Sequence, residues 1–87
     1  MTVSFYGGIK EKFTADEKSL EMNGVGSVRS LIDSLGEKYG DKFKDFLLGS
    51  GTCFFLVNGS GIMTTGGLAT KLSPGDKVDV LPFVDGG

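Results

Sequence analysis

The sequence of 87 residues contains no histidine and a single cysteine. Without histidine the chain can form neither a nucleophile-histidine pair nor a histidine metal site. We therefore predict no metal site, and metal-dependent or hydrolytic catalysis would need unusual machinery. The lone Cys53 excludes an internal disulfide and fits a reducing compartment.

The sequence also lacks an excess of positive charge and any long apolar run. Lys and Arg number 9 against 11 Asp and Glu, which gives a formal net charge of −2, whereas nucleic-acid binding requires a basic face. No stretch approaches the roughly 18 apolar residues of a membrane span, and the first residues lack the pattern of a secretory signal. We expect one cytoplasmic domain that binds neither nucleic acid nor membrane.

Glycine, by contrast, is abundant, with 15 residues. Gly24-Val25-Gly26 is followed by Arg29, where a dinucleotide-binding pattern has its third glycine. The P-loop signature of glycine, lysine and a hydroxyl residue does not occur anywhere in the sequence. We interpret the glycines as turns and predict no bound cofactor.

The clearest periodic signal runs from Ser27 to Tyr39 and predicts a helix. Apolar residues recur there at intervals of three, four or seven and line one helix face: Val28, Leu31, Ile32, Leu35 and Tyr39. Ser27 suits the N-cap and Gly40 the stop, while Gly36 inside costs about 1 kcal/mol relative to alanine. This helix must rely on tertiary packing. A shorter helix is predicted over residues 41–48 by their apolar spacing.

Apolar patterns also predict four strands. Residues 2–6 alternate, a weaker strand lies within residues 9–22, and residues 77–81 alternate after the turn signal Ser73-Pro74-Gly75-Asp76. Residues 53–57 form a continuous apolar run closed by Asn58-Gly59, which is typical of a strand covered on both faces. We expect that strand in the middle of the sheet with Cys53 buried, and one helical turn over residues 68–72. The predicted fold class is α+β, with the main helix across one face of a mixed sheet.

The last predicted strand leads directly into Leu81-Pro82-Phe83-Val84-Asp85-Gly86-Gly87. Val78 and Val80 point to one face, which leaves Leu81 and Phe83 on the charged face without an internal partner. They either meet a partner protein or cover the sheet edge. Pro82 can end strand pairing and direct the chain outward. We therefore predict a domain over residues 1–81 and an extended tail over residues 82–87.

Three motifs together resemble the ubiquitin-like sulfur carriers: Val57-Asn58-Gly59, the segment from Leu72 to Val78, and the segment from Leu81 to Gly87. Within that family the chain is most similar to the small subunit of molybdopterin synthase. The resemblance implies a ubiquitin-like β-grasp fold over the whole chain. The chain departs from the usual tail, in which a second proline and a small or hydroxyl residue precede the glycines.

The resemblance also implies a chemistry for the tail. Gly87, preceded by Gly86, is adenylated by an E1-like enzyme that consumes ATP and is then converted to a thiocarboxylate by a sulfur donor protein. The thiocarboxylate gives its sulfur to the acceptor on the large subunit of molybdopterin synthase. Residues expected to contact these partners are Leu81, Pro82, Phe83, Val84, Asp85 and Tyr6.

Other functions share parts of this pattern. The same carrier chemistry serves thiazole or cysteine synthesis with a different acceptor. A ubiquitin-like modifier joined to other proteins through Gly87 shares the chemistry as far as the adenylate, and a plain β-grasp interaction domain needs no terminal glycines. Tyr6 either packs or touches a partner, and Asp85 is either a solvated charge or pairs with a basic partner surface.

Overall fold

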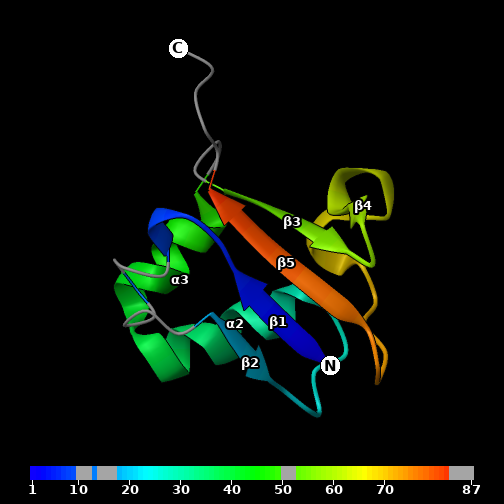
Figure 1. The fold of residues 1–87 in the computed structure, drawn as a ribbon, viewed down its shortest axis with the longest axis horizontal. Helices are drawn as coiled ribbons and strands as arrows, with labels where there is room; N and C mark the ends of the chain where they lie inside the picture. Colours follow the sequence, from blue (N-terminus) through cyan, green and yellow to red (C-terminus); the bar gives the residue numbers. More distant parts are fainter. Residues whose placement is uncertain (10–12, 14–17, 50–52, 83–87) are drawn as a thin grey trace.

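The computed structural model describes residues 1–9, 13, 18–49 and 53–82 (Figure 1). Within these residues one five-stranded sheet has the order β2-β1-β5-β3-β4. Its strands are β1 (Thr2–Phe5), β2 (Ser19–Glu21), β3 (Cys53–Val57), β4 (Ser60–Gly61) and β5 (Lys77–Pro82). The β1–β5 pair is parallel and the other pairs are antiparallel, so the predicted mixed sheet is confirmed.

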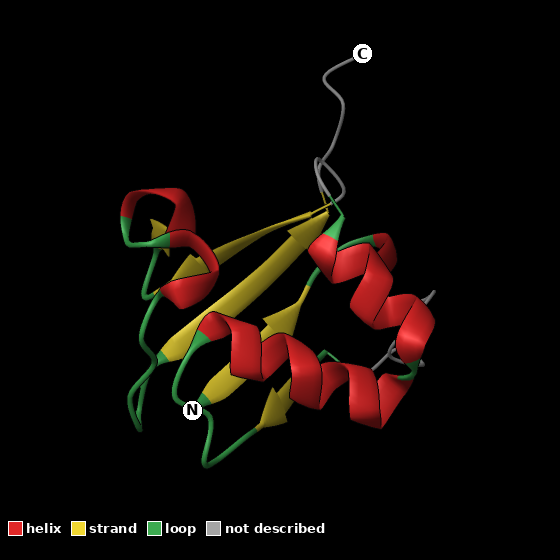
Figure 2. Cartoon of the chain, turned by 180° about the vertical axis from the view of Figure 1, so that it is seen from behind, coloured by secondary structure: helices red, strands yellow, loops and turns green. Residues whose placement is uncertain are grey.

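Among the described residues, the two longest helices cover one face of the sheet, as the view from behind in Figure 2 shows. They are α2 (Val28–Tyr39) and α3 (Asp41–Leu48). Two short 3₁₀ helices, η1 (Ile62–Thr64) and η2 (Gly67–Ala69), lie between β4 and β5. The helical turn predicted over residues 68–72 is observed as the 3₁₀ helix η2, which begins one residue earlier, at Gly67. No helix in the described residues is long and apolar enough to cross a membrane.

Helix α2 begins and ends where the sequence predicts. The Ser27 hydroxyl oxygen accepts a hydrogen bond from the Ser30 backbone N–H at 3.2 Å, which caps the first turn. Gly40, at φ 109°, ends the helix with its N–H bonded to the Gly36 carbonyl at 2.8 Å. Gly36 itself has a packing role, because a Cβ there would lie 2.9 Å from the Lys44 Cβ. The glycine inside α2 lets α3 approach closely.

The core lies between the helices and the sheet. Helix α2 contributes four side chains with 0% exposure, as its spacing predicts: Val28, Leu31, Ile32 and Leu35. Strands β1 and β5 contribute Val3, Phe5, Val78 and Val80, each 2% exposed or less. The Phe5 ring meets the Tyr39 and Phe43 rings edge-on at centroid distances of 5.9 and 6.1 Å. Burial of these apolar surfaces supplies most of the stabilisation of so small a domain.

The middle strand of the sheet is β5, and the prediction that β3 lies there is wrong. Strand β3 is fourth in the order and pairs with β4 only at Leu56 and Val57. Helices cover a single face, so alternate β3 residues point to the open face, where Phe54 is 42% exposed. Cys53 is partly buried rather than fully buried.

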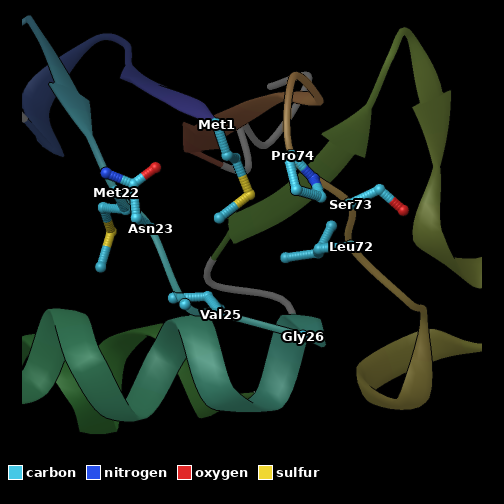
Figure 3. A pocket seen from close by; sticks show the side chains of 9 residues that line it. Met1, Met22, Asn23, Val25, Gly26, Leu72, Ser73 and Pro74 are labelled. Atoms are coloured by element: carbon cyan, nitrogen blue, oxygen red, sulfur yellow. The ribbon is translucent and has the colours of Figure 1, made fainter.

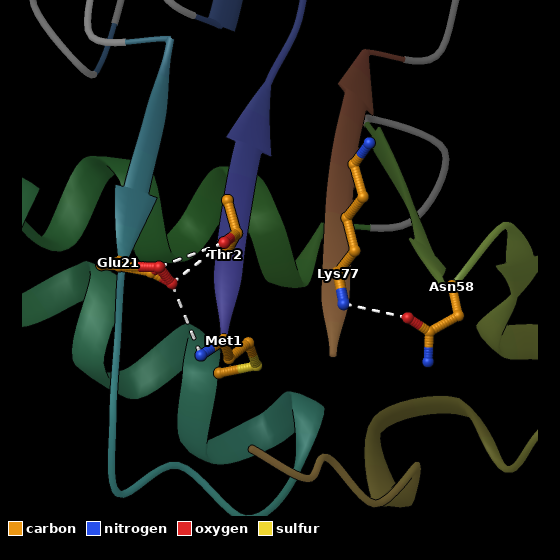
Figure 4. A network of polar contacts seen from close by, with 5 residues as sticks. All are labelled: Met1, Thr2, Glu21, Asn58 and Lys77. Atoms are coloured by element: carbon orange, nitrogen blue, oxygen red, sulfur yellow. Dashed lines mark hydrogen bonds and ion pairs between the residues drawn. The ribbon is translucent and has the colours of Figure 1, made fainter. Parts of the chain in front are cut away.

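Two of the motif segments are joined by hydrogen bonds at the start of β5. Asn58 and Gly59 have φ of 51° and 87° and form the turn of the β3–β4 hairpin. The Asn58 amide donates to Asp76 Oδ1 at 3.1 Å. Its oxygen accepts from the Lys77 N–H at 3.0 Å, as Figure 4 shows. Asp76 Oδ2 also accepts from the Ser73 N–H at 2.8 Å. This bond and the Asn58 amide lower the pKa of Asp76 below 3.8.

Candidate functional site at the end of β5

The described part of the candidate site is the root of the predicted tail. Three of the predicted site residues lie there, Tyr6, Leu81 and Pro82. The other five lie outside the described residues: Phe83, Val84, Asp85, Gly86 and Gly87. Strand β5 includes Pro82, the last described residue, and is thus one residue longer than predicted.

Neighbouring strands hold the end of β5 from both sides. In the parallel β1–β5 pair Phe5 lies opposite Val80, and the Tyr6 N–H continues the pairing to the Val80 carbonyl at 3.2 Å. In the antiparallel β3–β5 pair Phe54 lies opposite Leu81 and Cys53 lies opposite Pro82. Pro82, the last described residue, therefore lies at the end of the middle strand of the sheet (Figure 1).

Tyr6 lies beside this root on the open face of the sheet. The residue is 42% exposed, and its hydroxyl donates to Asp79 Oδ1 at 3.1 Å. That hydrogen bond and the negative charge of the carboxylate raise the pKa of Tyr6 above 10.0, because both disfavour the phenolate. The hydrogen bond ties the Tyr6 side chain to β5 at Asp79, two residues before Leu81.

The open face carries an apolar pair next to Tyr6. Val78 and Val80 point into the core with 0% exposure, so Leu81 points to the opposite face, as predicted from the alternation. There Leu81 is partly buried and lies opposite Phe54. Aromatic and aliphatic residues directly across an antiparallel pair contact each other. Phe54, Leu81 and Tyr6 together form what we call the root patch.

An apolar groove that local sequence patterns do not predict lies at the edge of β3. It has a volume of about 490 Å³, and its exposed lining includes Leu48, Phe54 and Met63. Met63 is 89% exposed. The sequence signal is the presence of large apolar residues, Ile62, Met63 and Leu68, inside a segment rich in glycine and threonine, residues 60–70. Phe54 belongs to both the groove and the root patch, so the two surfaces are continuous.

A smaller cavity lies at the other end of β5. It has a volume of about 290 Å³ and is lined mainly by apolar side chains, among them Met1, Met22, Val25 and Leu72 (Figure 3). Ser73 and Pro74, which precede β5, complete its wall, so this cavity is separate from the root of the tail. Among the described residues, no group of three or more His, Cys, Asp or Glu side chains is placed to hold a metal ion.

Residues 3–87 match the ThiS family. The chain belongs to the ThiS family. Membership in this family confirms the resemblance to the ubiquitin-like sulfur carriers. The matched region extends through the residues of the predicted tail to Gly87. No curated protein sequence matches the chain.

Solved structures similar to this ThiS-family chain carry several names. CysO in the BexX/CysO complex of Amycolatopsis orientalis has 28% identity and a TM-score of 0.78, covering 99% of this chain and 98% of that one. Small archaeal modifier protein 1 from Methanosarcina acetivorans has 29% identity and a TM-score of 0.78, with coverage of 99% and 94%. A putative molybdopterin converting factor subunit 1 from Pyrococcus furiosus has 26% identity and a TM-score of 0.71, with coverage of 95% of each chain. These likenesses confirm the β-grasp fold.

Proposed function

We propose that this chain is a sulfur carrier that acts through Gly87 as a non-catalytic protein working with partner enzymes. An E1-like enzyme consumes ATP to adenylate the terminal carboxylate and releases pyrophosphate. A sulfur donor protein then displaces AMP and leaves a thiocarboxylate. The thiocarboxylate gives its sulfur to an acceptor held by another enzyme, and hydrolysis returns the carboxylate for the next cycle.

Activation precedes sulfur transfer because a carboxylate is a poor electrophile. A terminal carboxyl has a pKa of about 3.3 to 3.7, so it is an anion at neutral pH. Adenylation neutralises that charge and supplies AMP as a leaving group. Gly86 and Gly87 suit this use, because no Cβ obstructs a narrow channel and φ can adapt to two different active sites.

The observation that carries this proposal is the course of β5. This strand lies in the middle of the sheet, is paired on both sides, and reaches Pro82, five residues before Gly87. The family match continues through those residues. A rigid root followed by a short tail with two glycines fits a carboxylate that is presented to active sites in other proteins.

Partner enzymes are proposed to bind the root patch together with the tail. The root patch combines an aromatic side chain held by a hydrogen bond, Tyr6, with the cross-strand pair of Phe54 and Leu81. Exposed aromatic side chains beside aliphatic ones are common anchors of protein interfaces. Among the similar structures, CysO occurs in a complex with BexX, which supports a partner protein in general.

For the acceptor we favour the pterin precursor of molybdopterin, held by the large subunit of molybdopterin synthase. Support comes from the Leu81-Pro82-Phe83 step and from the similarity to the putative molybdopterin converting factor subunit 1. Thiazole or cysteine synthesis uses the same tail chemistry with another acceptor. Incubation of the thiocarboxylated chain with the large subunit and the pterin precursor is expected to yield the dithiolene product.

The second candidate is a protein modifier joined to other proteins through Gly87. It is favoured by the likeness to a protein named as a small archaeal modifier, at 29% identity and a TM-score of 0.78. Its chemistry is shared with the carrier as far as the acyl-adenylate. An amine of the target protein then displaces AMP in place of sulfur.

Intact mass measurement separates the two candidates. The purified chain is incubated with the E1-like enzyme, ATP and sulfide, with and without a mixture of lysine-bearing proteins. A sulfur carrier gains the mass of one oxygen-to-sulfur exchange at its C-terminus. A modifier gives isopeptide-linked species instead. A chain that lacks Gly87 is the matched control and is expected to remain unchanged in both reactions.

A further inference from the structure

Gly7 contacts the ring of Pro82 at the root of the tail. Its φ is +61°, the left-handed conformation that glycine adopts most readily. A Cβ built on Gly7 would lie 2.8 Å from Pro82 Cγ and 3.4 Å from Pro82 Cδ. The absent side chain of Gly7 thus leaves the space in which the Pro82 ring is seated.

A side chain at position 7 would displace Pro82 rather than the end of β1. Tyr6 is held to β5 by two hydrogen bonds, from its N–H to the Val80 carbonyl at 3.2 Å and from its hydroxyl to Asp79 at 3.1 Å. Pro82 has no N–H with which to bond a neighbouring strand. Pro82 lies opposite Cys53 in the β3–β5 pair, so the expected response to a side chain at position 7 is a shift of the proline ring with the strand pairing kept.

We propose that Gly7 is a positioning residue for the reaction at Gly87, because its missing side chain sets the direction in which the chain leaves Pro82. This inference rests on the proposed sulfur-carrier function. Gly7 does not touch the reacting carboxylate and acts only through Pro82. Its role is to align the tail with a channel in an enzyme that holds the domain by the root patch.

A side chain at position 7 would shift the point at which the tail begins. With alanine at position 7, the ring must retreat by at least about 0.6 Å to reach ordinary van der Waals contact at 3.4 Å. Residues 83–87 follow Pro82 directly, so this shift changes the position from which they enter the active site of the partner enzyme. A misplacement of about 1 Å at a reacting centre can slow a reaction by about 100-fold.

Three alanine variants separate this contact from general effects. Gly7→Ala adds both left-handed strain and the clash with Pro82. Gly24→Ala adds strain alone, because Gly24 has φ +77° and nothing within 4 Å of the added Cβ. Gly8→Ala adds a methyl group to the adjacent residue, where φ is not left-handed and the space is open.

The first measurement is single-turnover adenylation with the E1-like enzyme in excess over each chain and ATP saturating. Gly7→Ala is expected to lower the maximal rate by at least about 10-fold and to change the half-saturating enzyme concentration by less than about three-fold. Partial unfolding would have the opposite signature, since it lowers the competent fraction without slowing the competent molecules. Both control variants are expected to stay within about two-fold of wild type.

Removal of the ring provides a rescue. The rate ratio between Gly7→Ala/Pro82→Ala and Pro82→Ala is compared with the ratio between Gly7→Ala and wild type. If the ring transmits the effect, Gly7→Ala costs less than about three-fold in the Pro82→Ala background. The comparison stays valid whatever Pro82→Ala alone does to the rate.

A structural measurement does not depend on any enzyme. Residual dipolar couplings of the Leu81 N–H and the Pro82 Cα–Hα bonds report the direction of the root relative to the domain. Gly7→Ala is expected to change these couplings while those of α2 keep their wild-type fit. Gly24→Ala is expected to leave the Leu81 and Pro82 couplings unchanged.

Two failures are distinguishable. If the wild-type chain is not adenylated, the sulfur-carrier proposal itself is overturned. If wild type is adenylated and Gly7→Ala reaches the same maximal rate as Gly24→Ala, the positioning role alone is overturned. Loss of rate in Gly7→Ala that persists undiminished in the Pro82→Ala background, or unchanged couplings at Leu81, also overturns it.

Discussion

Phe54 and Phe55 are adjacent in β3 and permit a direct test of which face binds partners. Phe55 points into the core and is 4% exposed, whereas Phe54 belongs to the root patch and is 42% exposed. The two residues are neighbours in the sequence, are of the same type and lie in the same strand. Alanine substitution of each therefore compares the two faces of the sheet with little else changed.

The expected losses of stability follow from burial. Phe55→Ala removes a buried ring and leaves a cavity, which costs about 3 to 5 kcal/mol. Phe54→Ala leaves no cavity and, with 42% of the residue already exposed, forfeits burial of roughly 70 Å² of apolar surface. At 25 cal/mol per Å² that corresponds to about 1 to 2 kcal/mol once a compact unfolded state is allowed for. A domain of this size has a total stability of about 4 to 13 kcal/mol.

Binding is expected to show the reverse order. If Phe54 anchors the E1-like enzyme, its truncation to alanine costs 1 kcal/mol or more of binding free energy. The dissociation constant then rises by at least about five-fold. Phe55→Ala, measured below its unfolding transition, is expected to bind like wild type. Urea unfolding followed by circular dichroism gives the stabilities, and isothermal titration calorimetry with the E1-like enzyme gives the affinities.

One result would refute the assignment of the root patch. Phe54→Ala would have to lower stability as much as Phe55→Ala while leaving the dissociation constant unchanged. Phe54 would then belong to the core, and the partner would bind elsewhere. Leu81→Ala and Val80→Ala form a second matched pair on β5 and are expected to repeat the contrast.

Three further predictions concern the core, the tail and acid stability. Leu31→Ala is expected to cost about 2 to 5 kcal/mol, because Leu31 is 0% exposed; an unchanged urea midpoint would contradict this. Deleting Gly87, or adding one uncleaved residue after it, is expected to abolish thiocarboxylate formation, measured by mass spectrometry, without altering the fold. Either change moves the carboxylate by about 3.3 to 3.6 Å. Gly86→Ala is expected to reduce thiocarboxylate formation less than either change. Asp76 has a lowered pKa, so the stability that it contributes is complete above pH 3.8 and is lost as pH falls through its lower folded pKa. Urea midpoints of wild type and Asp76→Asn are therefore expected to converge in acid, and a gap that stays constant down to about pH 2 would exclude this linkage.

Local patterns in the sequence predict the helices well. The apolar spacing of residues 27–39 reflects a single buried face, and Ser27 and Gly40 act as end signals through hydrogen bonds within the same segment. The buried set of α2 is correct for the same reason. What the spacing leaves out is that Gly36 allows α3 to approach, because that contact joins two separate elements.

Strand order is a non-local property, and the wrong placement of β3 follows from this. A continuous apolar run such as residues 53–57 is typical of a strand covered on both faces. In this fold the open face carries Phe54 instead, so the run reflects an exposed apolar surface as well as a core. The order β2-β1-β5-β3-β4 depends on which strands meet across long loops, which period-2 alternation does not encode.

The sequence predicts one part of the candidate site, and only the folded chain shows the other. The motif from Leu81 to Gly87 and the alternation in β5 predict which residues leave the core, and the structure bears out the opposite directions of Val80 and Leu81. Gly7 and Gly8 are both interpreted as turn residues from the sequence. Only the folded chain distinguishes them, because Gly7 alone has a left-handed φ and faces Pro82.

The parallel pairing of β1 with β5 has a mechanical consequence. Thr2 lies opposite Lys77 and Phe5 lies opposite Val80, so a force applied at Pro82 along β5 acts in shear on this pair. The same force also acts in shear on the β3–β5 pair, because β5 is bordered on both sides. In this geometry many hydrogen bonds must rupture together rather than one after another, which makes forced unfolding slow. The described end of β5 at Pro82 is therefore held against a pull along the strand by both of its neighbours.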